Sequence, residues 1–285
     1  AALFQLLAEL PSQARGPVME CMGVYLAILD APSVAAAFGQ VRAMLEQSLQ
    51  TYVPSAPAPG QPEANSPRYV PPVPHTMLDL CVALVPYVRG AEARALFDLA
   101  SSVLPKADGG LQKKAYRVLG RLLRGSEAPA LRAHYGVSAL LRAWAALDVQ
   151  PGAVRDRLQL LEALVAHVPP AELGVLSALV PEAVLGTKEA NQGARGAAYE
   201  LLVQMGHRLQ AGGTIDRAQA GVADGVVEAS ANEFVMMVVA GLAGASPHMM
   251  GATIAALARL LYEFAAVLPA ETVSELLATM LVFLE

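Results

Sequence analysis

Five positively charged side chains recur at helical spacing within one short segment of the chain. They are Lys113, Lys114, Arg117, Arg121 and Arg124. On a helix over 110–124 they share one face, and the opposite face carries Leu111, Ala115, Val118, Leu119 and Leu122. A stripe of like charges is mutually repulsive, so it does not stabilise the helix by pairing within it. We therefore expect it to contact a phosphate backbone or an acidic peptide; the alternative is a solvated basic face without a partner.

Two further cations extend this candidate site. Arg155 and Arg157 lie on an expected helix over 151–167, and equivalent helices of a repeat array stack side by side, which would continue the stripe. No aromatic platform is interleaved with the stripe, so reading of single-stranded bases by stacking is not indicated.

The charge of the chain is unevenly distributed. The formal net charge is −5, but residues 106–157 hold ten basic and four acidic residues, a net charge of +6. The remaining residues hold ten basic and twenty-one acidic residues, a net charge of −11. An attraction to polyanions would therefore be local to this window.

Enzyme motifs are missing from the sequence. There is no phosphate-binding loop, no dinucleotide fingerprint, no nucleophile elbow, no H-E-x-x-H and no C-x-x-C. The five histidines are scattered singly, and we expect Cys21 and Cys81 to be small core residues of a protein from a reducing compartment. We expect no catalytic residue, metal, cofactor or small-molecule substrate.

The composition favours a helical protein that is not embedded in a membrane. Residues of the AVILMFWYC set make up 55% of the chain and aromatic residues only 5%, so the apolar content suits close helix packing. Apolar stretches such as 234–245 stop short of the roughly 18 to 20 residues that cross a bilayer. Apolar residues recur at intervals of three and four, and strand signals are nearly absent, which predicts an all-α fold. The expected helices are 1–10, 17–29, 33–51, 76–89, 91–103, 110–124, 128–146, 151–167, 169–183, 191–209, 231–243, 247–267 and 270–285.

The helices follow a repeat of about forty residues. With Leu119, Leu161, Leu201 and Leu260 as anchors, the spacings are 42, 40 and 59 residues. A period of roughly 40 to 47 residues with two helices per unit is typical of HEAT and armadillo repeats. We predict one α-solenoid over 1–285 with about six helical hairpins, in which the four leucines are buried. The second helices of the hairpins, from 17–29 to 247–267, would form one layer.

Two segments interrupt this pattern. Residues 52–75 are rich in proline, which cannot donate a backbone hydrogen bond, so we expect an extended insertion there. Residues 211–230 lack a strong apolar face and account for the long third spacing, so we expect a second, peripheral loop insertion. Deletion of 215–226 should then leave the melting temperature nearly unchanged.

Three segments carry a resemblance to a known family. LQKKAYRVLGRLL (111–123), VLGTKEANQGARGAAYELLVQMG (184–206) and EFVMMVVAGLAGASPHMMGATIAALARLLYEF (233–264) resemble the ribosomal RNA-processing protein 12 family, HEAT-repeat factors of eukaryotic small-subunit ribosome assembly. The resemblance covers roughly residues 110–285.

The resemblance implies a non-catalytic scaffold in ribosome biogenesis, located in the nucleolus and nucleus. Its implied partners are pre-ribosomal RNA and small-subunit assembly factors, and its implied roles are pre-rRNA processing, assembly of the precursor and preribosome export. Because that family's proteins are several times longer and the first residue is not Met, we expect an internal part of a longer solenoid.

Another HEAT function remains open on the sequence alone. An importin-like transport adaptor, or another HEAT protein-interaction scaffold, would share the repeat pattern. Ran or the nuclear-transport machinery would be the partner of an importin-like adaptor.

Overall fold

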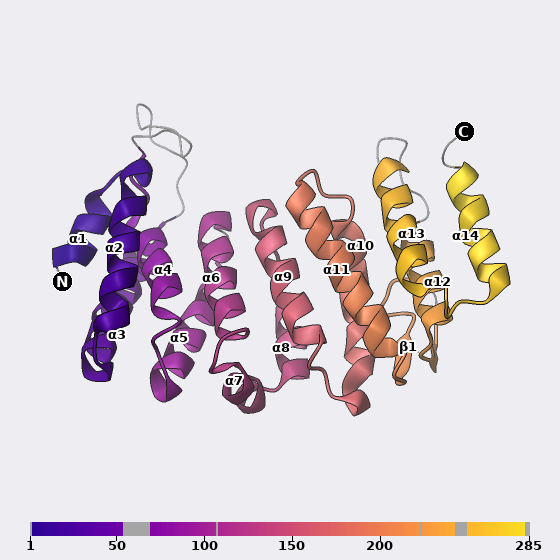
Figure 1. Ribbon diagram of the computed structural model, residues 1–285, viewed down its shortest axis with the longest axis horizontal. Helices are drawn as coiled ribbons and strands as arrows, with labels where there is room; N and C mark the ends of the chain where they lie inside the picture. The colour runs from indigo at the N-terminus through magenta and orange to yellow at the C-terminus, as the bar shows by residue number, and fades with distance from the viewer. Residues whose placement is uncertain (1, 54–68, 107, 223, 243–249, 283–285) are drawn as a thin grey trace. The chain divides into compact units, whose positions relative to one another are not determined.

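The protein is all-α, as the sequence predicts. The computed structural model describes residues 2–53, 69–106, 108–222, 224–242 and 250–282 (Figure 1). Within these ranges it contains fourteen α-helices, three 3-10 segments and two short strands. The chain divides into two compact units, the first comprising residues up to Arg132 together with Asp148–Ala153, the second comprising Ala133–Leu147 and Val154–Glu285.

The first unit is built of antiparallel helix pairs. Helix α3 pairs with α4, and α5 pairs with α6; the pairs stack so that α4 lies against α6 and α3 against α5 (Figure 1). Helix α2 lies beside α4, which places α2, α4 and α6 in one layer. The elements are α1 (Ala2–Glu9), η1 (Ser12–Ala14), α2 (Arg15–Ile28), α3 (Ala31–Thr51), α4 (Val73–Leu84), α5 (Gly90–Val103), α6 (Gly109–Leu122) and η2 (Pro151–Ala153), and α7 (Ala128–Tyr135) begins in this unit.

The second unit repeats the same arrangement. Helices α9, α11 and α13 lie side by side in one layer, while η3 lies against α8, and α10 against α12, in the other. The elements are α8 (Val137–Ala145), α9 (Val154–Val165), η3 (Pro170–Leu179), α10 (Val180–Gly186), α11 (Gln192–Leu209), β1 (Thr214–Asp216), β2 (Val226–Glu228), α12 (Ala231–Leu242), α13 (Met250–Phe264) and α14 (Ala270–Val282). Two-helix units that stack on their neighbours are the HEAT and armadillo style of repeat.

The four leucine anchors lie in the apolar core. Leu119, Leu161 and Leu201 are 0% exposed and Leu260 is 1% exposed. They lie on α6, α9, α11 and α13 respectively. The predicted register of these four helices is confirmed.

Two expected helices are interrupted. The expected helix over 128–146 ends and restarts at Gly136, whose φ of 74° is a conformation that side-chain-bearing residues rarely adopt. The expected helix over 169–183 is a 3-10 segment followed by α10, with Pro181 in the first turn of α10. Proline has no N–H to donate, so an unbroken α-helix through this point would lose a backbone hydrogen bond.

The segment 211–230 packs as part of the second unit, whereas we expected a peripheral loop insertion without a strong apolar face. Strands β1 and β2 form an antiparallel hairpin in which Ile215 pairs with Val227. Ile215 is 0% exposed, the hairpin lies against η3, and the N–H of Asp216 donates to the Ser177 hydroxyl at 2.9 Å. An isolated two-stranded hairpin is marginally stable in water, so contact with η3 stabilises it.

The Pro-rich segment connects α3 to α4 in the sequence of the first unit. Helix α3 ends at Thr51, and α4 begins at Val73, three residues earlier than expected. Residues 54–68 of the expected insertion lie outside the described residues.

Candidate functional site

Helix α6 presents the basic stripe because both its start and its inner face are fixed. The Asp108 carboxylate accepts the N–H of Leu111 at 2.7 Å and so caps the helix. The expected apolar face is buried: Leu111, Ala115, Val118, Leu119 and Leu122 are each at most 1% exposed. Burial of this face directs the opposite side of α6 outward.

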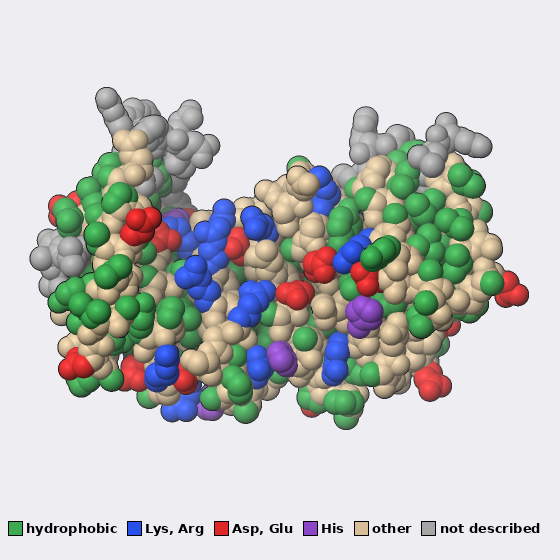
Figure 2. Space-filling model, in the orientation of Figure 1, with side chains coloured by type: hydrophobic (Ala, Val, Ile, Leu, Met, Phe, Trp, Pro, Cys, Tyr) green, Lys and Arg blue, Asp and Glu red, His purple; other side chains and the backbone are tan. Residues whose placement is uncertain are grey.

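Three of the predicted site residues, Lys113, Arg117 and Arg121, lie on the outer side of α6, and a fourth, Arg124, lies in the turn that follows the helix. Arg117, Arg121 and Arg124 are exposed, and Lys113 is partly exposed. Figure 2 shows lysine and arginine side chains gathered over α6. We refer to Lys113, Arg117, Arg121 and Arg124 as the basic face.

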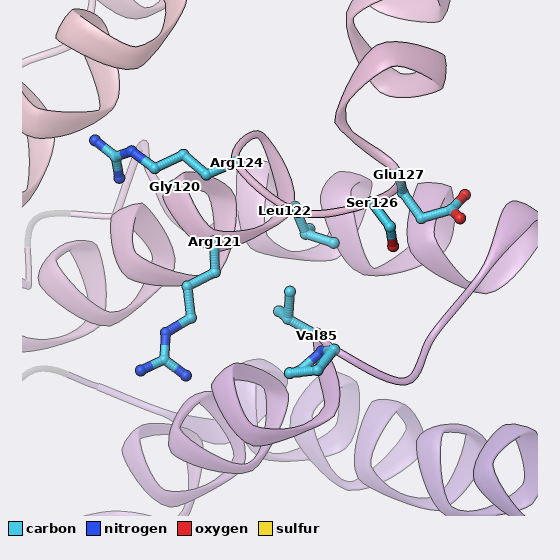
Figure 3. A pocket seen from close by; sticks show the side chains of 9 residues that line it. Val85, Gly120, Arg121, Leu122, Arg124, Ser126 and Glu127 are labelled. Atoms are coloured by element: carbon cyan, nitrogen blue, oxygen red, sulfur yellow. The ribbon is translucent and has the colours of Figure 1, made fainter. Parts of the chain in front are cut away.

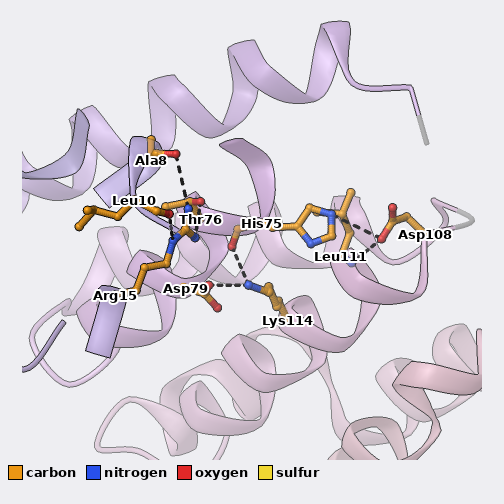
Figure 4. A network of polar contacts seen from close by, with 9 residues as sticks. All are labelled: Ala8, Leu10, Arg15, His75, Thr76, Asp79, Asp108, Leu111 and Lys114. Atoms are coloured by element: carbon orange, nitrogen blue, oxygen red, sulfur yellow. Dashed lines mark hydrogen bonds and ion pairs between the residues drawn. The ribbon is translucent and has the colours of Figure 1, made fainter. Parts of the chain in front are cut away.

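Lys114 does not belong to this face. Its ammonium forms an ion pair with Asp79 and donates to the carbonyl of His75 at 3.2 Å, and its side chain is only 18% exposed (Figure 4). Burial lowers the pKa of the Lys114 ammonium below its ordinary value, although the Asp79 carboxylate acts in the opposite direction. Lys114 therefore joins α6 to α4 and is withdrawn from the proposed contact surface.

A polar network joins the start of α6 to both sides of the Pro-rich segment. The Tyr52 hydroxyl, just after α3, donates to Asp108 Oδ2 at 2.6 Å and lies 3.2 Å from His75 Nε2. His75 Nε2 lies 3.7 Å from Asp108 Oδ1. The network therefore holds residues 52 and 75 together at the N-cap of α6.

Burial and hydrogen bonding set the charges in this network. Burial lowers the pKa of His75, and the nearby Asp108 carboxylate opposes this shift only in part. Burial alone would raise the pKa of Asp108, but hydrogen bonds from Tyr52 and from the N–H of Leu111 bring it below its ordinary value. The same ring nitrogen of His75, Nε2, lies near both Tyr52 and Asp108, whereas a histidine in a catalytic relay uses its two ring nitrogens for different partners. The arrangement serves to position α6.

The two arginines expected to extend the stripe lie on α9, in the second unit. Arg157 is 2% exposed; its Nε lies 2.6 Å from Glu182 Oε1, and its Nη1 donates to the carbonyl of Leu147 at 2.6 Å. It links α9 to α10 and is withdrawn from the contact surface. Arg155 is exposed. Its side chain lies beside Gly193 in the first turn of α11: a Cβ atom added to Gly193 would be 3.2 Å from Arg155 Cδ. The continuation of the basic face to Arg155 stays a prediction.

A hollow that sequence reasoning missed adjoins the basic face in the first unit (Figure 3). It has a volume of about 400 Å³ and lies between the ends of α4 and α6. Arg121 and Arg124 lie on one side of it, and Ser126 and Glu127 on the other. Its floor is formed by small or apolar residues: Val85, Pro86, Gly120, Leu122 and Gly125.

Other candidate chemistry does not converge on a site. No group of three or more His, Cys, Asp or Glu residues that could hold a metal ion is found in the described part of the chain. Cys81 is buried as expected, and burial raises the pKa of its thiol to about 12; Cys21 is exposed, contrary to the expectation. Among the described helices, none has the length and apolar character needed to cross a membrane.

The comparisons with known proteins identify relatives of this chain. No family model matches it. Ribosomal RNA-processing protein 12 of Saccharomyces cerevisiae is 28% identical over 93% of the chain, and the RRP12-like proteins of Gallus gallus and Homo sapiens are 33% and 31% identical over 66% and 71% of it. Two engineered proteins of known crystal structure align with 92% and 97% of the chain at 15% identity, with TM-scores of 0.44 and 0.45.

These relatives are much longer than the chain. The chain spans 21% of the yeast protein, 14% of the chicken protein and 15% of the human protein. The similarity agrees with the resemblance carried by the segments 111–123, 184–206 and 233–264. The chain is a homologue of the proteins named ribosomal RNA-processing protein 12 and RRP12-like.

Proposed function

We propose that the chain is a non-catalytic scaffold segment that takes part in ribosomal RNA processing. The observation that carries this proposal is the similarity to Ribosomal RNA-processing protein 12 over 93% of the chain. Stacked helix pairs support it, because such arrays expose extended surfaces for binding other macromolecules. The partners would be pre-ribosomal RNA and small-subunit assembly factors, in the nucleolus and nucleus, with a further part in preribosome export.

The basic face is the part of the described surface best suited to an anionic partner. Lys113, Arg117 and Arg121 follow one another at intervals of four residues, so their Cα atoms are about 6 Å apart along the axis of α6. The window around them has a net charge of +6 in a chain of net charge −5. Attraction of an anionic partner would therefore be concentrated here and would weaken with salt.

Purification of the tagged full-length protein from cells tests this proposal. RNA sequencing and mass spectrometry of the purified material should show precursor rRNA and small-subunit assembly factors enriched over an untagged control. A nuclease-treated sample separates partners held by RNA from partners held by protein contacts. Material without precursor rRNA, whose composition instead depends on the nucleotide state of Ran, would contradict the proposal and favour a transport adaptor.

A further inference from the structure

We propose that the hollow at the ends of α4 and α6, together with Arg121 and Arg124, binds a short acidic peptide segment of a partner protein. One apolar side chain of the peptide would enter the hollow, and neighbouring carboxylates would meet the two guanidinium groups. The inference rests on the proposed scaffold function, and it assigns this surface of the protein to partners that carry an acidic peptide segment.

The floor of the hollow favours an apolar side chain. Leu122 and Val85 approach each other from α6 and the end of α4 (Figure 3), and Gly120 and Gly125 contribute no side chain to fill the space. The volume of about 400 Å³ lies at the lower end of the range for ligand pockets, about 300 to 1,000 Å³, and admits a leucine or phenylalanine side chain. Burial of such a side chain would remove apolar surface from water on both partners.

The same floor disfavours RNA as the occupant. A phosphate group would meet the two arginines and leave the apolar floor in contact with water. A base would need an aromatic platform for stacking, and no aromatic side chain is among the residues that line the hollow. The combination of an apolar floor with cations on one side fits a peptide that carries both kinds of side chain.

The charges around the hollow give the peptide a direction. Arg121 and Arg124 lie on one side, and Arg121 Nη1 donates to the carbonyl of Val82 at 3.3 Å, which holds it over the end of α4 (Figure 3). Glu127 lies on the other side, where its Oε2 accepts the N–H of Gly90 at 3.0 Å. On that side Arg89 Nε lies 3.9 Å from Glu127 Oε1 and offsets part of its charge, so the carboxylates of the peptide would be attracted chiefly to the side of Arg121 and Arg124.

The basic face continues from the hollow along α6. Its steps of about 6 Å from Arg121 to Arg117 and Lys113 nearly match every second residue of an extended peptide, at about 3.3 Å per residue. The expected ligand is therefore an apolar residue beside acidic residues at alternate positions.

Selection from a displayed library of random twelve-residue peptides tests this inference, with the full chain as the target. Enriched peptides should combine a leucine, isoleucine or phenylalanine with several aspartates or glutamates. One such peptide, made with a fluorescent label, is then titrated by anisotropy. Replacement of its apolar residue by serine should weaken binding about tenfold or more, which is what loss of one buried aliphatic side chain costs.

Three variants of the protein connect binding to the hollow. Arg121→Glu with Arg124→Glu should weaken binding of the peptide more than tenfold. Ser126→Trp, a change at an exposed position that fills the hollow, should weaken it about tenfold. Arg142→Glu, at an exposed position of α8 in the second unit, should change it less than twofold. Circular dichroism confirms that each variant is folded.

Several outcomes would overturn the inference. The selected peptides could fail to combine acidic and apolar residues. The peptide with serine in place of its apolar residue could bind within twofold of its parent, or the Ser126→Trp variant could bind the peptide with unchanged affinity. Labelled single-stranded RNA that binds through the arginines but is insensitive to Ser126→Trp, with no peptide enriched, would make this face an RNA interface. Peptide binding without precursor rRNA in the cellular purification would sustain the inference while the proposed function fails.

Discussion

Replacement of Ile215 by alanine should destabilise the second unit, because this large apolar side chain is completely buried in a segment whose sequence resembles a surface loop. Ile215 is 0% exposed and lies on β1, which packs against η3. The change removes three methyl or methylene groups, each worth about 0.8 kcal/mol on burial, so the transfer from water alone accounts for about 2.4 kcal/mol. The cavity left behind adds to this loss, which brings the expected cost to about 2 to 4 kcal/mol.

Equilibrium urea unfolding, followed by circular dichroism, measures this cost. The matched control is Val226→Ala on the other strand of the hairpin, since Val226 is 64% exposed and pairs with Asp216. This control should change the free energy of unfolding by less than about 0.5 kcal/mol.

A loss below about 0.5 kcal/mol for Ile215→Ala would show that Ile215 does not stabilise the second unit and that 211–230 is a peripheral loop, as expected from the sequence. Deletion of 215–226 should, on the present structure, lower the melting temperature by several degrees, because it removes Ile215 together with the Asp216 hydrogen bond to Ser177.

Three further predictions follow from the core and from the polar network. Lys114→Met should lower the free energy of unfolding by about 1 to 2 kcal/mol, because it leaves a partly buried carboxylate without its ion pair, whereas Lys113→Met should change it by less than about 0.5 kcal/mol; equal losses in urea would contradict the different placements of the two lysines. Burial holds the folded-state pKa of His75 below its ordinary value of 6.5, so the contribution of His75 to stability is fully present above about pH 6.5 and is lost as the pH falls through the folded-state pKa. His75→Gln should therefore flatten the dependence of the unfolding free energy on pH between 7.5 and 5.5, and an unchanged slope would show that His75 does not titrate in this way. Leu161→Ala should cost about 2 to 5 kcal/mol, and a loss under 1 kcal/mol would be inconsistent with its complete burial.

The sequence was sufficient for the helices that repeat their apolar pattern. Leu161 is buried because periodicity at three and four residues reports which side of a helix faces the core. The start at Asn191 was also readable, since its side chain accepts the N–H of Ala194 at 3.1 Å, a cap that depends only on local residues. Gly136 and Pro181 are residues that often interrupt helices, but the helical apolar pattern continues on both sides of each, so the sequence predicts unbroken helices there.

The sequence was insufficient where the partner of a side chain is distant. Lys113 and Lys114 are neighbours of the same charge, and only the approach of Asp79, 35 residues away, separates a surface lysine from a structural one. Arg157 is likewise buried through Glu182, 25 residues away. Ile215 lies between Gly213-Thr214 and Asp216-Arg217, so local periodicity carries no signal for its burial. The hollow forms where the ends of α4 and α6 meet, with Gly120 and Gly125 leaving space between them, and no motif in the linear sequence indicates such a meeting of helix ends.

Recovery of precursor rRNA by the full-length protein, with and without the basic face, tests whether this surface takes part in the proposed function. Lys113→Glu, Arg117→Glu and Arg121→Glu are introduced together, Arg142→Glu serves as the control, and precursor rRNA is quantified at equal amounts of purified protein. The triple variant should recover several-fold less precursor rRNA with its assembly factors, while the control should match the wild type. Equal recovery by all three proteins would show that the basic face is only a solvated surface and does not take part in recovery of precursor rRNA.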